Sequence, residues 1–352
     1  MNIIPVHTSS YYDVCIGSGL LDRVGELSLP VVSGRNALIV SDSNVWPLYG
    51  PRLQSSLEQH GFVVKHFEFQ AGEPSKTPQT LLRIIQTMCN RGLTRSDVVY
   101  ALGGGVTGDL TGLASALYLR GISCIQVPTS LLAMVDSSVG GKTAVDLPEG
   151  KNLVGTFTQP RGVICDPDVL KTLEPRVMAE GWAEIIKYGM LGSQDLLDAL
   201  ANGPDHVDLE SIIAHCVGMK RDLVAEDEQD TGVRQLLNFG HTIGHAIEQK
   251  AHYTLYHGEA VAIGMAIMTR AWVRLGHCDQ ECLTILEDLL HKYDLPDQCN
   301  IECADLLEAA KADKKRRGDT ITLVQPIRPG MCMLNKSDYK ELEEILNVGM
   351  KP

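Results

Sequence analysis

Three histidines close together in the second half of the chain could bind a metal ion. His241 and His245 are four residues apart in NFGHTIGHAIEQ, so both project from one face of a helix. His257 follows sixteen residues after His241, in HGEAV, and Glu184 lies three residues before Lys187 on an earlier helical segment. Two histidines and a carboxylate, with one coordination position left open, are the usual ligands of a catalytic zinc ion. The spacing does not decide which two of the three histidines are the ligands.

A glycine-rich turn in the first half has the composition of a nucleotide-binding site. The sequence GGGVTGD, residues 103–109, follows an apolar run and precedes an apolar helical segment. Glycines let the backbone approach a pyrophosphate, and the start of the helix supplies N–H donors. The turn follows the third or fourth expected strand, and no acidic residue ends the next one. We therefore expect a nucleotide site of unusual connectivity, with Asp42 as the candidate ribose-binding acid.

The segment after the next expected strand, residues 128–155, reads as a long connection rich in small residues. It contains Asp136, Lys142, Lys151 and Asn152. A connection this long inside a compact domain is more often functional than idle. Lysines beside glycines can bind a phosphate as point charges, although ordinary solvated lysines would give the same pattern.

An α/β domain followed by a helical domain is expected to position these residues. The first half alternates apolar strand-like runs with segments of helical spacing, which predicts a Rossmann-like parallel sheet with helices on both faces. The expected strands cover residues 36–41, 62–69, 98–102 and 122–127, and the expected helices cover residues 45–60 and 78–91.

Helical spacing dominates from about residue 175 onwards. The expected helices cover residues 176–191, 209–225, 234–250, 258–275, 280–293 and 337–346, with a hairpin at 320–324 and 331–334. The change in composition predicts two domains, residues 1–172 and residues 173–352, the second mostly α-helical.

Composition excludes several classes of protein. The 352 residues carry a net charge of −13, which disfavours binding to nucleic acids or to anionic membranes. The longest stretch without charged residues, 121–135, is too short to span a membrane. The N-terminal residues do not resemble a secretory signal, and the ten cysteines form no CxxC pair. We therefore expect a cytoplasmic protein with reduced thiols.

Taken together, the motifs resemble the 3-dehydroquinate synthase family of sugar-phosphate cyclases along nearly the whole chain. In chain order they are GEPSK, GGGVTGD, VPTSLLAMVDSSVGGKTAVD, GKNLVG, CDPDVLKTL, AEIIKYG, NFGHTIGHAIE, HGEAVAIGM and ADKK. The resemblance implies an NAD-binding α/β domain (1–172), an α-helical metal- and substrate-binding domain (173–352) and a homodimer.

The resemblance also implies a reaction, that of a carbon–oxygen lyase of the shikimate pathway of aromatic amino-acid biosynthesis. The substrate 3-deoxy-D-arabino-heptulosonate 7-phosphate would be converted to 3-dehydroquinate and phosphate. The implied steps are transient NAD-dependent oxidation, phosphate elimination, re-reduction and intramolecular aldol closure.

The same resemblance assigns residues to roles. One Zn²⁺ or Co²⁺ per chain would be bound by Glu184, His241 and His257, which leaves His245 as a proton-relay residue. The other residues implied in catalysis are Lys187, Asp136, Lys142, Lys151 and Asn152. The implied substrate contacts are Lys220, Arg234, Asn238, Lys314 and, from a partner subunit, Arg120. The implied NAD contacts are Asp42, Glu73, Lys76, Gly105, Val106, Thr107, Gly108, Asp109, Thr129, Ser130, Lys142, Lys151, Val169, Leu170, Lys171 and Thr172.

Three other functions remain open from the sequence. A metal-dependent polyol dehydrogenase of similar two-domain build would share the glycine turn and the helix histidines, but it has no need for so many anion-binding cations. Another sugar-phosphate cyclase could act on a substrate without a carboxylate; Arg234 and Lys314 favour the carboxylated one. A cofactor-binding protein without catalysis would have no physical need for the complete set of metal-site residues.

Overall fold

The computed structural model describes residues 1–252, 254–312 and 320–351, and its contacts divide the chain into two compact units. The first unit contains residues 1–173 and 209–229, and the second contains residues 174–208 and 230–352. The sequence-based division placed residues 209–229 in the second domain, whereas their contacts group them with the first unit. Among the described residues, no helix has both the length and the apolar composition needed to cross a bilayer.

The first unit is built on a seven-stranded sheet in the order β1-β2-β9-β6-β5-β3-β4. Its strands are β1 (Asn2–His7), β2 (Tyr11–Ile16), β3 (Asn36–Asp42), β4 (Val63–Phe69), β5 (Val98–Gly103), β6 (Ser123–Pro128) and β9 (Gly162–Cys165). All neighbours pair in parallel except β1 and β2, which form an antiparallel hairpin at one edge. The α/β class expected from the alternation of strands and helices is confirmed.

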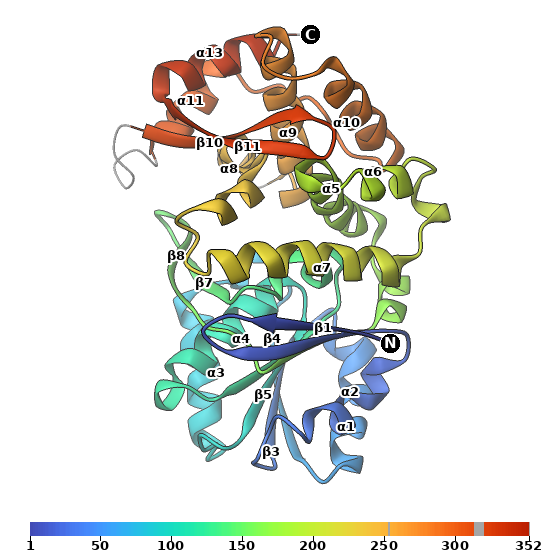
Figure 1. The fold of residues 1–352 in the computed structure, drawn as a ribbon. Helices are drawn as coiled ribbons and strands as arrows, with labels where there is room; N and C mark the ends of the chain where they lie inside the picture. Colours follow the sequence, from blue (N-terminus) through green and yellow to red (C-terminus); the bar gives the residue numbers. More distant parts are fainter. Residues whose placement is uncertain (253, 313–319, 352) are drawn as a thin grey trace. The chain divides into compact units, whose positions relative to one another are not determined.

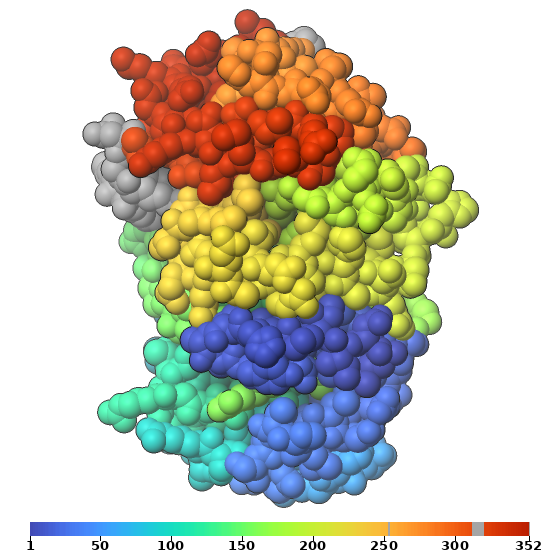
Figure 2. Space-filling view, in the orientation of Figure 1, coloured from blue at the N-terminus to red at the C-terminus, as the bar shows by residue number. Residues whose placement is uncertain are grey.

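Helices cover both faces of this sheet (Figure 1). They are α1 (Val24–Ser28), α2 (Trp46–Gln59), α3 (Pro78–Asn90), α4 (Gly105–Leu117) and α7 (Leu209–Glu226), with short helical turns η1 (Leu20–Arg23), η2 (Glu73–Ser75), η3 (Tyr118–Arg120), η4 (Ala133–Ser137) and η5 (Pro167–Thr172). Helix α7 packs on the edge hairpin, which lies at the surface in the space-filling view (Figure 2). On the hairpin, the side chains of Ile3 and Tyr11 are more than half exposed.

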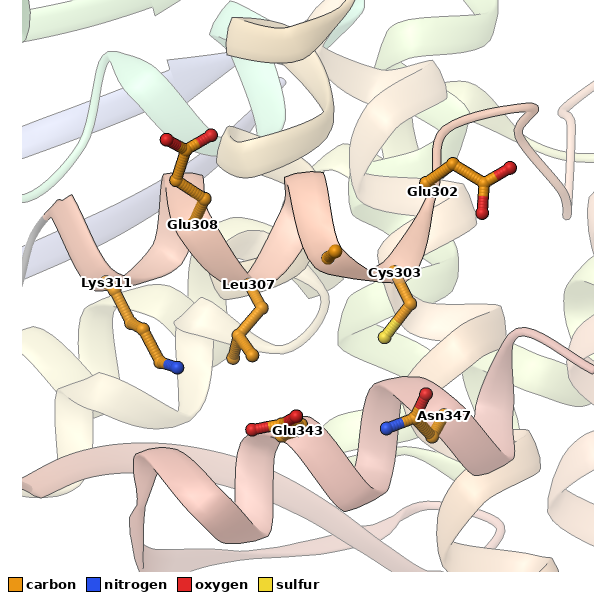
Figure 3. Close-up of a pocket in the computed structure, with 8 residues that line it drawn as sticks. Glu302, Cys303, Leu307, Glu308, Lys311, Glu343 and Asn347 are labelled. Atoms are coloured by element: carbon orange, nitrogen blue, oxygen red, sulfur yellow. The ribbon is translucent and has the colours of Figure 1, made fainter.

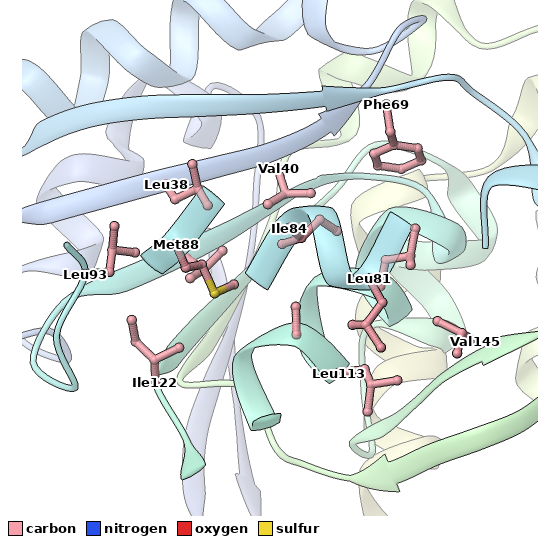
Figure 4. Packing of buried hydrophobic residues seen from close by; sticks show 13 residues of the cluster. Leu38, Val40, Phe69, Leu81, Ile84, Met88, Leu93, Leu113, Ile122 and Val145 are labelled. Atoms are coloured by element: carbon pink, nitrogen blue, oxygen red, sulfur yellow. The ribbon is translucent and has the colours of Figure 1, made fainter. Parts of the chain in front are cut away.

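The core of the first unit lies between the sheet and helices α3 and α4. Leu38 and Val40 of β3 meet Leu81 and Ile84 of α3, and Leu113 of α4 completes the layer (Figure 4). These aliphatic side chains are almost completely buried, and each such burial contributes about 1.5–3 kcal/mol to folding. The core fixes α4, and therefore fixes the glycine turn that precedes it.

Residues 128–155 are not the long irregular connection that the sequence predicted. They contain the π-helical turn η4 and most of a second, two-stranded antiparallel sheet, formed by β7 (Lys142–Leu147) and β8 (Gly150–Phe157). Small and polar residues concealed this hairpin, because its second strand buries few side chains. The basic residues of the segment therefore lie on regular backbone.

The second unit is mostly helical, as expected. Its helices are α5 (Pro175–Gly192), α6 (Gln194–Leu200), α8 (His241–Lys250), α9 (His257–Arg274), α10 (Gln280–Lys292), α11 (Cys303–Ala312) and α13 (Tyr339–Gly349), with the turns η6 (Pro204–His206) and η7 (Val233–Asn238). The antiparallel strands β10 (Thr320–Arg328) and β11 (Met331–Asp338) are longer than predicted. The single helix expected over residues 234–250 is in fact η7 and α8, separated at Gly240, which has a φ of 79°.

Candidate metal centre and nucleotide site

Glu184, His241 and His257 bring their donor atoms together in the second unit. Glu184 lies on α5, His241 begins α8 and His257 begins α9. Glu184 Oε1 lies 3.5 Å from Nε2 of His241 and 3.5 Å from Nε2 of His257. One ligand atom of each residue falls within 4.8 Å of the others. A carboxylate and two imidazoles at this spacing match the donor set of a zinc site.

The two histidines differ in their electrostatic surroundings. Burial and the neighbouring Lys187 lower the pKa of His241 to about 3, so its ring is neutral and can offer a lone pair. Burial alone would lower the pKa of His257, but hydrogen bonds to Glu184 and Glu248 outweigh it and raise that pKa to about 10. The ring of His257 therefore lies in a negative field, where a divalent cation can replace its proton.

Glycines allow helices α8 and α9 to approach closely enough to bring the two histidines together. A Cβ on Gly264 of α9 would lie 2.1 Å from the carbonyl oxygen of Gly240, and a Cβ on Gly244 would lie 3.1 Å from that of Ala260. Gly240 also adopts the left-handed conformation immediately before His241. The position of His241 thus depends on three glycines that contribute no side chain to the site.

The start of α9 is fixed by an ion pair and a capping interaction. The Tyr256 backbone N–H donates to Glu259 Oε2 at 2.8 Å, and Arg176 donates to both carboxylate oxygens of Glu259. The Arg176 guanidinium also lies over the Tyr256 ring, 4.0 Å from its centre. Because His257 is the first residue of α9, these contacts fix its backbone.

His245 lies one turn beyond His241 on α8 and is exposed. Its ring centre is 5.5 Å from that of His241 and 5.9 Å from that of His257. His245, Glu248 and His257 form a second group whose ligand atoms lie within 4.8 Å of one another. The geometry therefore brings all three histidines together, and the choice of ligands remains a prediction.

Three further predicted residues of the second unit lie on α5 itself or on the turn η7 that precedes α8. Lys187 is fully buried on α5, and its Nζ forms an ion pair with Glu184 Oε2. Arg234, 1% exposed, and Asn238 both lie on η7, which precedes α8. Lys314 lies outside the described residues.

The glycine turn connects β5 to α4 in the first unit. A Cβ on Gly103 would lie 2.3 Å from Thr107 Oγ1, so this glycine is required by local packing. Gly105 begins α4, and Thr107 Oγ1 lies 3.4 Å from Asp42 Oδ2 at the end of the neighbouring strand β3. The structure thus brings Asp42 beside the first turn of α4, at the carboxyl ends of parallel strands, where nucleotides bind in α/β folds.

Lys76 connects two groups of predicted site residues within the first unit. It is 5% exposed, and its Nζ lies 2.7 Å from Asp109 Oδ2 and 2.6 Å from Asn152 Oδ1. Asp146 accepts a hydrogen bond from the Asn152 backbone and donates its own backbone N–H to the Lys76 carbonyl. Burial raises the pKa of Asp109, and Lys76 opposes that rise. The family resemblance implied Lys76, Asp109 and Asn152 as site residues, but nothing in the sequence indicated that Lys76 contacts the other two.

A second cation–carboxylate pair joins α7 to η4. Lys220 is 6% exposed, and its Nζ donates to the Asp136 carbonyl oxygen at 2.6 Å and forms an ion pair with the Asp136 carboxylate. Lys151 Nζ lies 3.7 Å from Glu73 Oε1, with its side chain 27% exposed. Lys142 is exposed at the start of β7.

The remaining predicted residues of the first unit occupy varied positions. Thr129 donates its backbone N–H to the Gly103 carbonyl, Ser130 Oγ accepts from the Ala133 backbone, and Val106 packs on the hydrophobic core. In η5, Leu170 is buried and Lys171 forms an ion pair with Asp168. The hydroxyl of Tyr49, on α2, donates to the Val169 carbonyl and lies 2.5 Å from Thr172 Oγ1. Arg120 is exposed and has a φ of 64°.

A groove of about 520 Å³ lies between α11 and α13 but carries no catalytic arrangement (Figure 3). Its lining residues include none of the predicted site residues. Burial and the neighbouring Glu343 and Glu302 raise the pKa of the Cys303 thiol, which opposes its use as a nucleophile.

Family models and curated relatives match the chain over most of its length. The model of the 3-dehydroquinate synthase N-terminal region matches residues 66–180, and that of the C-terminal region matches residues 181–316. The chain is 42% identical over 343 residues to the 3-dehydroquinate synthase of Clostridium acetobutylicum, covering 96% of each chain. It is 44% identical over 345 residues to that of Streptococcus sanguinis, covering 95% of this chain and 96% of the relative.

Several solved structures superpose on the chain over nearly its whole length. A 2-deoxy-scyllo-inosose synthase complexed with carbaglucose-6-phosphate, NAD⁺ and Co²⁺ superposes with a TM-score of 0.88 at 25% identity, over 98% of this chain and 99% of that one. A 2-epi-5-epi-valiolone synthase from Streptomyces hygroscopicus with NAD⁺ and Zn²⁺ bound gives 0.88 at 26% identity, over 98% of each chain. An iron-containing alcohol dehydrogenase, at 0.69 and 14% identity over 98% and 99% of the chains, shares the fold alone. Because two family models and full-length relatives agree, the chain belongs to the 3-dehydroquinate synthase family.

Proposed function

We propose that the chain is a 3-dehydroquinate synthase, a carbon–oxygen lyase that converts 3-deoxy-D-arabino-heptulosonate 7-phosphate to 3-dehydroquinate and phosphate. The observation that carries the proposal is the convergence of the Glu184, His241 and His257 donor atoms in a member of this family. A dehydrogenase is not favoured, because the alcohol dehydrogenase resembles the chain in fold alone.

Glu184, His241 and His257 would hold one Zn²⁺ or Co²⁺, the ions present in the related cyclases. When bound, such an ion supplies Lewis acidity toward oxygen atoms of the substrate. Lys187 holds the Glu184 carboxylate through their buried ion pair, which orients its other oxygen toward the histidines. His245 is exposed beside this cluster, so it can exchange a proton with solvent and transfer it to the substrate.

The first unit would bind NAD at the glycine turn, and NAD when bound supplies reversible hydride transfer. Backbone N–H groups at the start of α4 would donate to the pyrophosphate, and the Asp42 carboxylate beside this turn would accept from a ribose hydroxyl. The predicted cofactor contacts are Asp42, Glu73, Lys76, Gly105, Val106, Thr107, Gly108, Asp109, Thr129, Ser130, Lys142, Lys151, Val169, Leu170, Lys171 and Thr172.

The substrate carries a phosphate and a carboxylate, so cations must be concentrated locally in a chain of net charge −13. The residues predicted to contact the substrate are Asp136, Lys142, Lys151, Asn152, Lys187, Lys220, Arg234, Asn238 and Lys314. Arg120 would serve the site of a partner subunit in a homodimer. We further propose a cytoplasmic location, in keeping with ten cysteines that form no CxxC pair.

Incubation with the heptulosonate phosphate, NAD and Zn²⁺ tests the proposal, with phosphate and dehydroquinate as the measured products. We expect His241→Ala and His257→Ala to purify largely free of metal. His245→Ala should retain about one ion per chain and turn over roughly 10²–10⁴-fold more slowly. The exposed His206 on η6 provides the control, because His206→Ala should match the wild type in both measurements. Loss of metal from the His245 variant with retention in either of the others would overturn the ligand assignment.

A further inference from the structure

The two predicted histidine ligands present the same ring edge to Glu184. In each ring Nε2 lies 3.5 Å from Glu184 Oε1. The Nδ1 of His241 lies 3.1 Å from the carbonyl oxygen of Phe239, and the Nδ1 of His257 lies 3.3 Å from Glu248 Oε2. An acceptor beside Nδ1 favours the tautomer that carries its proton there and keeps the Nε2 lone pair free. The two rings differ in that one acceptor is a backbone carbonyl and the other is a charged side chain.

We propose that Glu248 is a positioning residue for the metal centre. By accepting the Nδ1–H of His257, its carboxylate fixes the orientation and tautomer of that ring and increases the electron-donating strength of Nε2. The inference rests on the proposed function, because it assumes that His257 binds a divalent ion through Nε2. Glu248 itself contributes no ligand to that ion.

The burial of Glu248 supports this role. The residue is 2% exposed, and a buried carboxylate is costly unless it is paired and hydrogen-bonded. It lies on α8, the helix that His241 begins, whereas His257 begins α9. Helix α8 thus supplies one ligand and the hydrogen-bond acceptor for the other. A glutamate whose only role is to increase solubility would be exposed to solvent.

The group formed by His245, Glu248 and His257 allows a competing interpretation, in which Glu248 is a ligand of a second ion. The two interpretations differ in stoichiometry, because Glu248 as acceptor for the Nδ1–H leaves one ion per chain. A second site would instead bind another ion through Glu248 and would lose it when the carboxylate is removed. Counting bound ions therefore separates the two.

Zinc affinity of three proteins tests the inference: Glu248→Gln, Glu248→Leu and the control Glu281→Gln, an exposed glutamate in the first turn of α10. Each is titrated with Zn²⁺ against a competing chelator, and the Co²⁺-loaded forms are compared by absorption spectroscopy. We expect Glu248→Leu to weaken binding by about 10–100-fold, as outer hydrogen-bond partners of metal ligands usually do. Glu248→Gln keeps a neutral acceptor and should fall between this variant and the wild type.

The control should match the wild type in affinity and in its Co²⁺ spectrum. Should Glu248→Leu not fold, Glu248→Gln still decides, because a weakened affinity with an altered spectrum supports the positioning role. Wild-type affinity in Glu248→Gln, or two ions bound per wild-type chain, would overturn the inference while leaving the proposed function intact. A wild-type protein that binds no Zn²⁺ would overturn the proposed metal site as well.

Discussion

Replacement of Lys76 by methionine should destabilise the first unit by about 3–5 kcal/mol, the usual result of breaking a buried ion pair by removing one partner. Methionine keeps most of the stem and deletes the ammonium group, which lies 2.7 Å from Asp109 Oδ2 and 2.6 Å from Asn152 Oδ1. The side chains of Lys76 and Asp109 are only 7% and 20% exposed, so solvent screens the pair weakly.

The magnitude follows from two opposing contributions. At the 2.7 Å separation and an effective dielectric constant of about 20, the attraction between Lys76 and Asp109 is about 6 kcal/mol. Removing each ion from water costs several kcal/mol, so the intact pair contributes little net stability. The single variant keeps the cost of burying Asp109 and loses the attraction. The double variant Lys76→Met/Asp109→Leu removes both and should recover most of the loss.

The loss should also depend on pH in a defined direction. Burial already raises the pKa of Asp109 with Lys76 in place, and removing the lysine raises it further. The folded variant then binds more protons than its unfolded chain, so its stability falls as pH rises between the unfolded and folded pKa values of Asp109. Lys76→Met should therefore be more damaging at pH 8 than at pH 5.

Urea unfolding without NAD measures these effects, so that loss of a cofactor contact does not enter the comparison. Unfolding is followed at both pH values for the wild type, the single variant and the double variant. A loss below about 1 kcal/mol in the single variant, or no recovery in the double variant, would refute the account of a buried pair.

Three further predictions concern residues with different roles. Asp97→Asn should cost about 1.5–3 kcal/mol in urea unfolding at neutral pH, because the buried carboxylate accepts hydrogen bonds from Thr94 and Asn36. Burial would raise the pKa of Asp97, but these hydrogen bonds lower it. The contribution of the Asp97 carboxylate to the free energy of unfolding is therefore lost as pH falls through its folded pKa, so the stability of the variant should approach that of the wild type in acid. Gly264→Ala should lower stability by about 1–3 kcal/mol and weaken Zn²⁺ binding, since its Cβ would lie 2.1 Å from a backbone oxygen; normal values of both would contradict the packing argument. Lys151→Ala should change the free energy of unfolding by only about 0.5 kcal/mol but should lower kcat/KM by an amount equivalent to about 1.5–3 kcal/mol. Full activity would contradict the proposed substrate contact, and unfolding would show that the residue is structural.

The sequence predicted four strands of the central sheet, β3, β4, β5 and β6, and its signal is clearest where a strand is an apolar run buried on both faces. Strand β5, for example, is buried at every residue, and this leaves a continuous hydrophobic signal. Strands β1 and β2, which form the hairpin at the edge of the sheet, and the short strand β9 were not predicted, and the exposed strand β8 lies in a segment that the sequence predicted as a connection. Pairing between strands stabilises these segments, and pairing partners cannot be identified from local composition.

The sequence predicted site residues that lie close together along the chain, but it did not predict contacts between residues far apart in the sequence. His241, His245 and His257 were found together because they are close in sequence, whereas the break at Gly240 was missed because glycine within a helical pattern does not specify its conformation. The contact of Lys76 with Asn152 joins residues 76 positions apart, and no spacing rule predicts it. Glu248 was overlooked because a glutamate on a helix is usually a solvated residue.

The most direct test of the proposed function is the amount of NAD that the reaction consumes. Purified protein is supplied with the heptulosonate phosphate in large excess over NAD, and phosphate, dehydroquinate and NADH are measured together. If the bound cofactor returns to its starting redox state in each cycle, phosphate and dehydroquinate should form in equal amounts over many turnovers while NADH does not accumulate. NADH formed in proportion to consumed substrate, with little phosphate released, would contradict the account and identify the chain as a dehydrogenase.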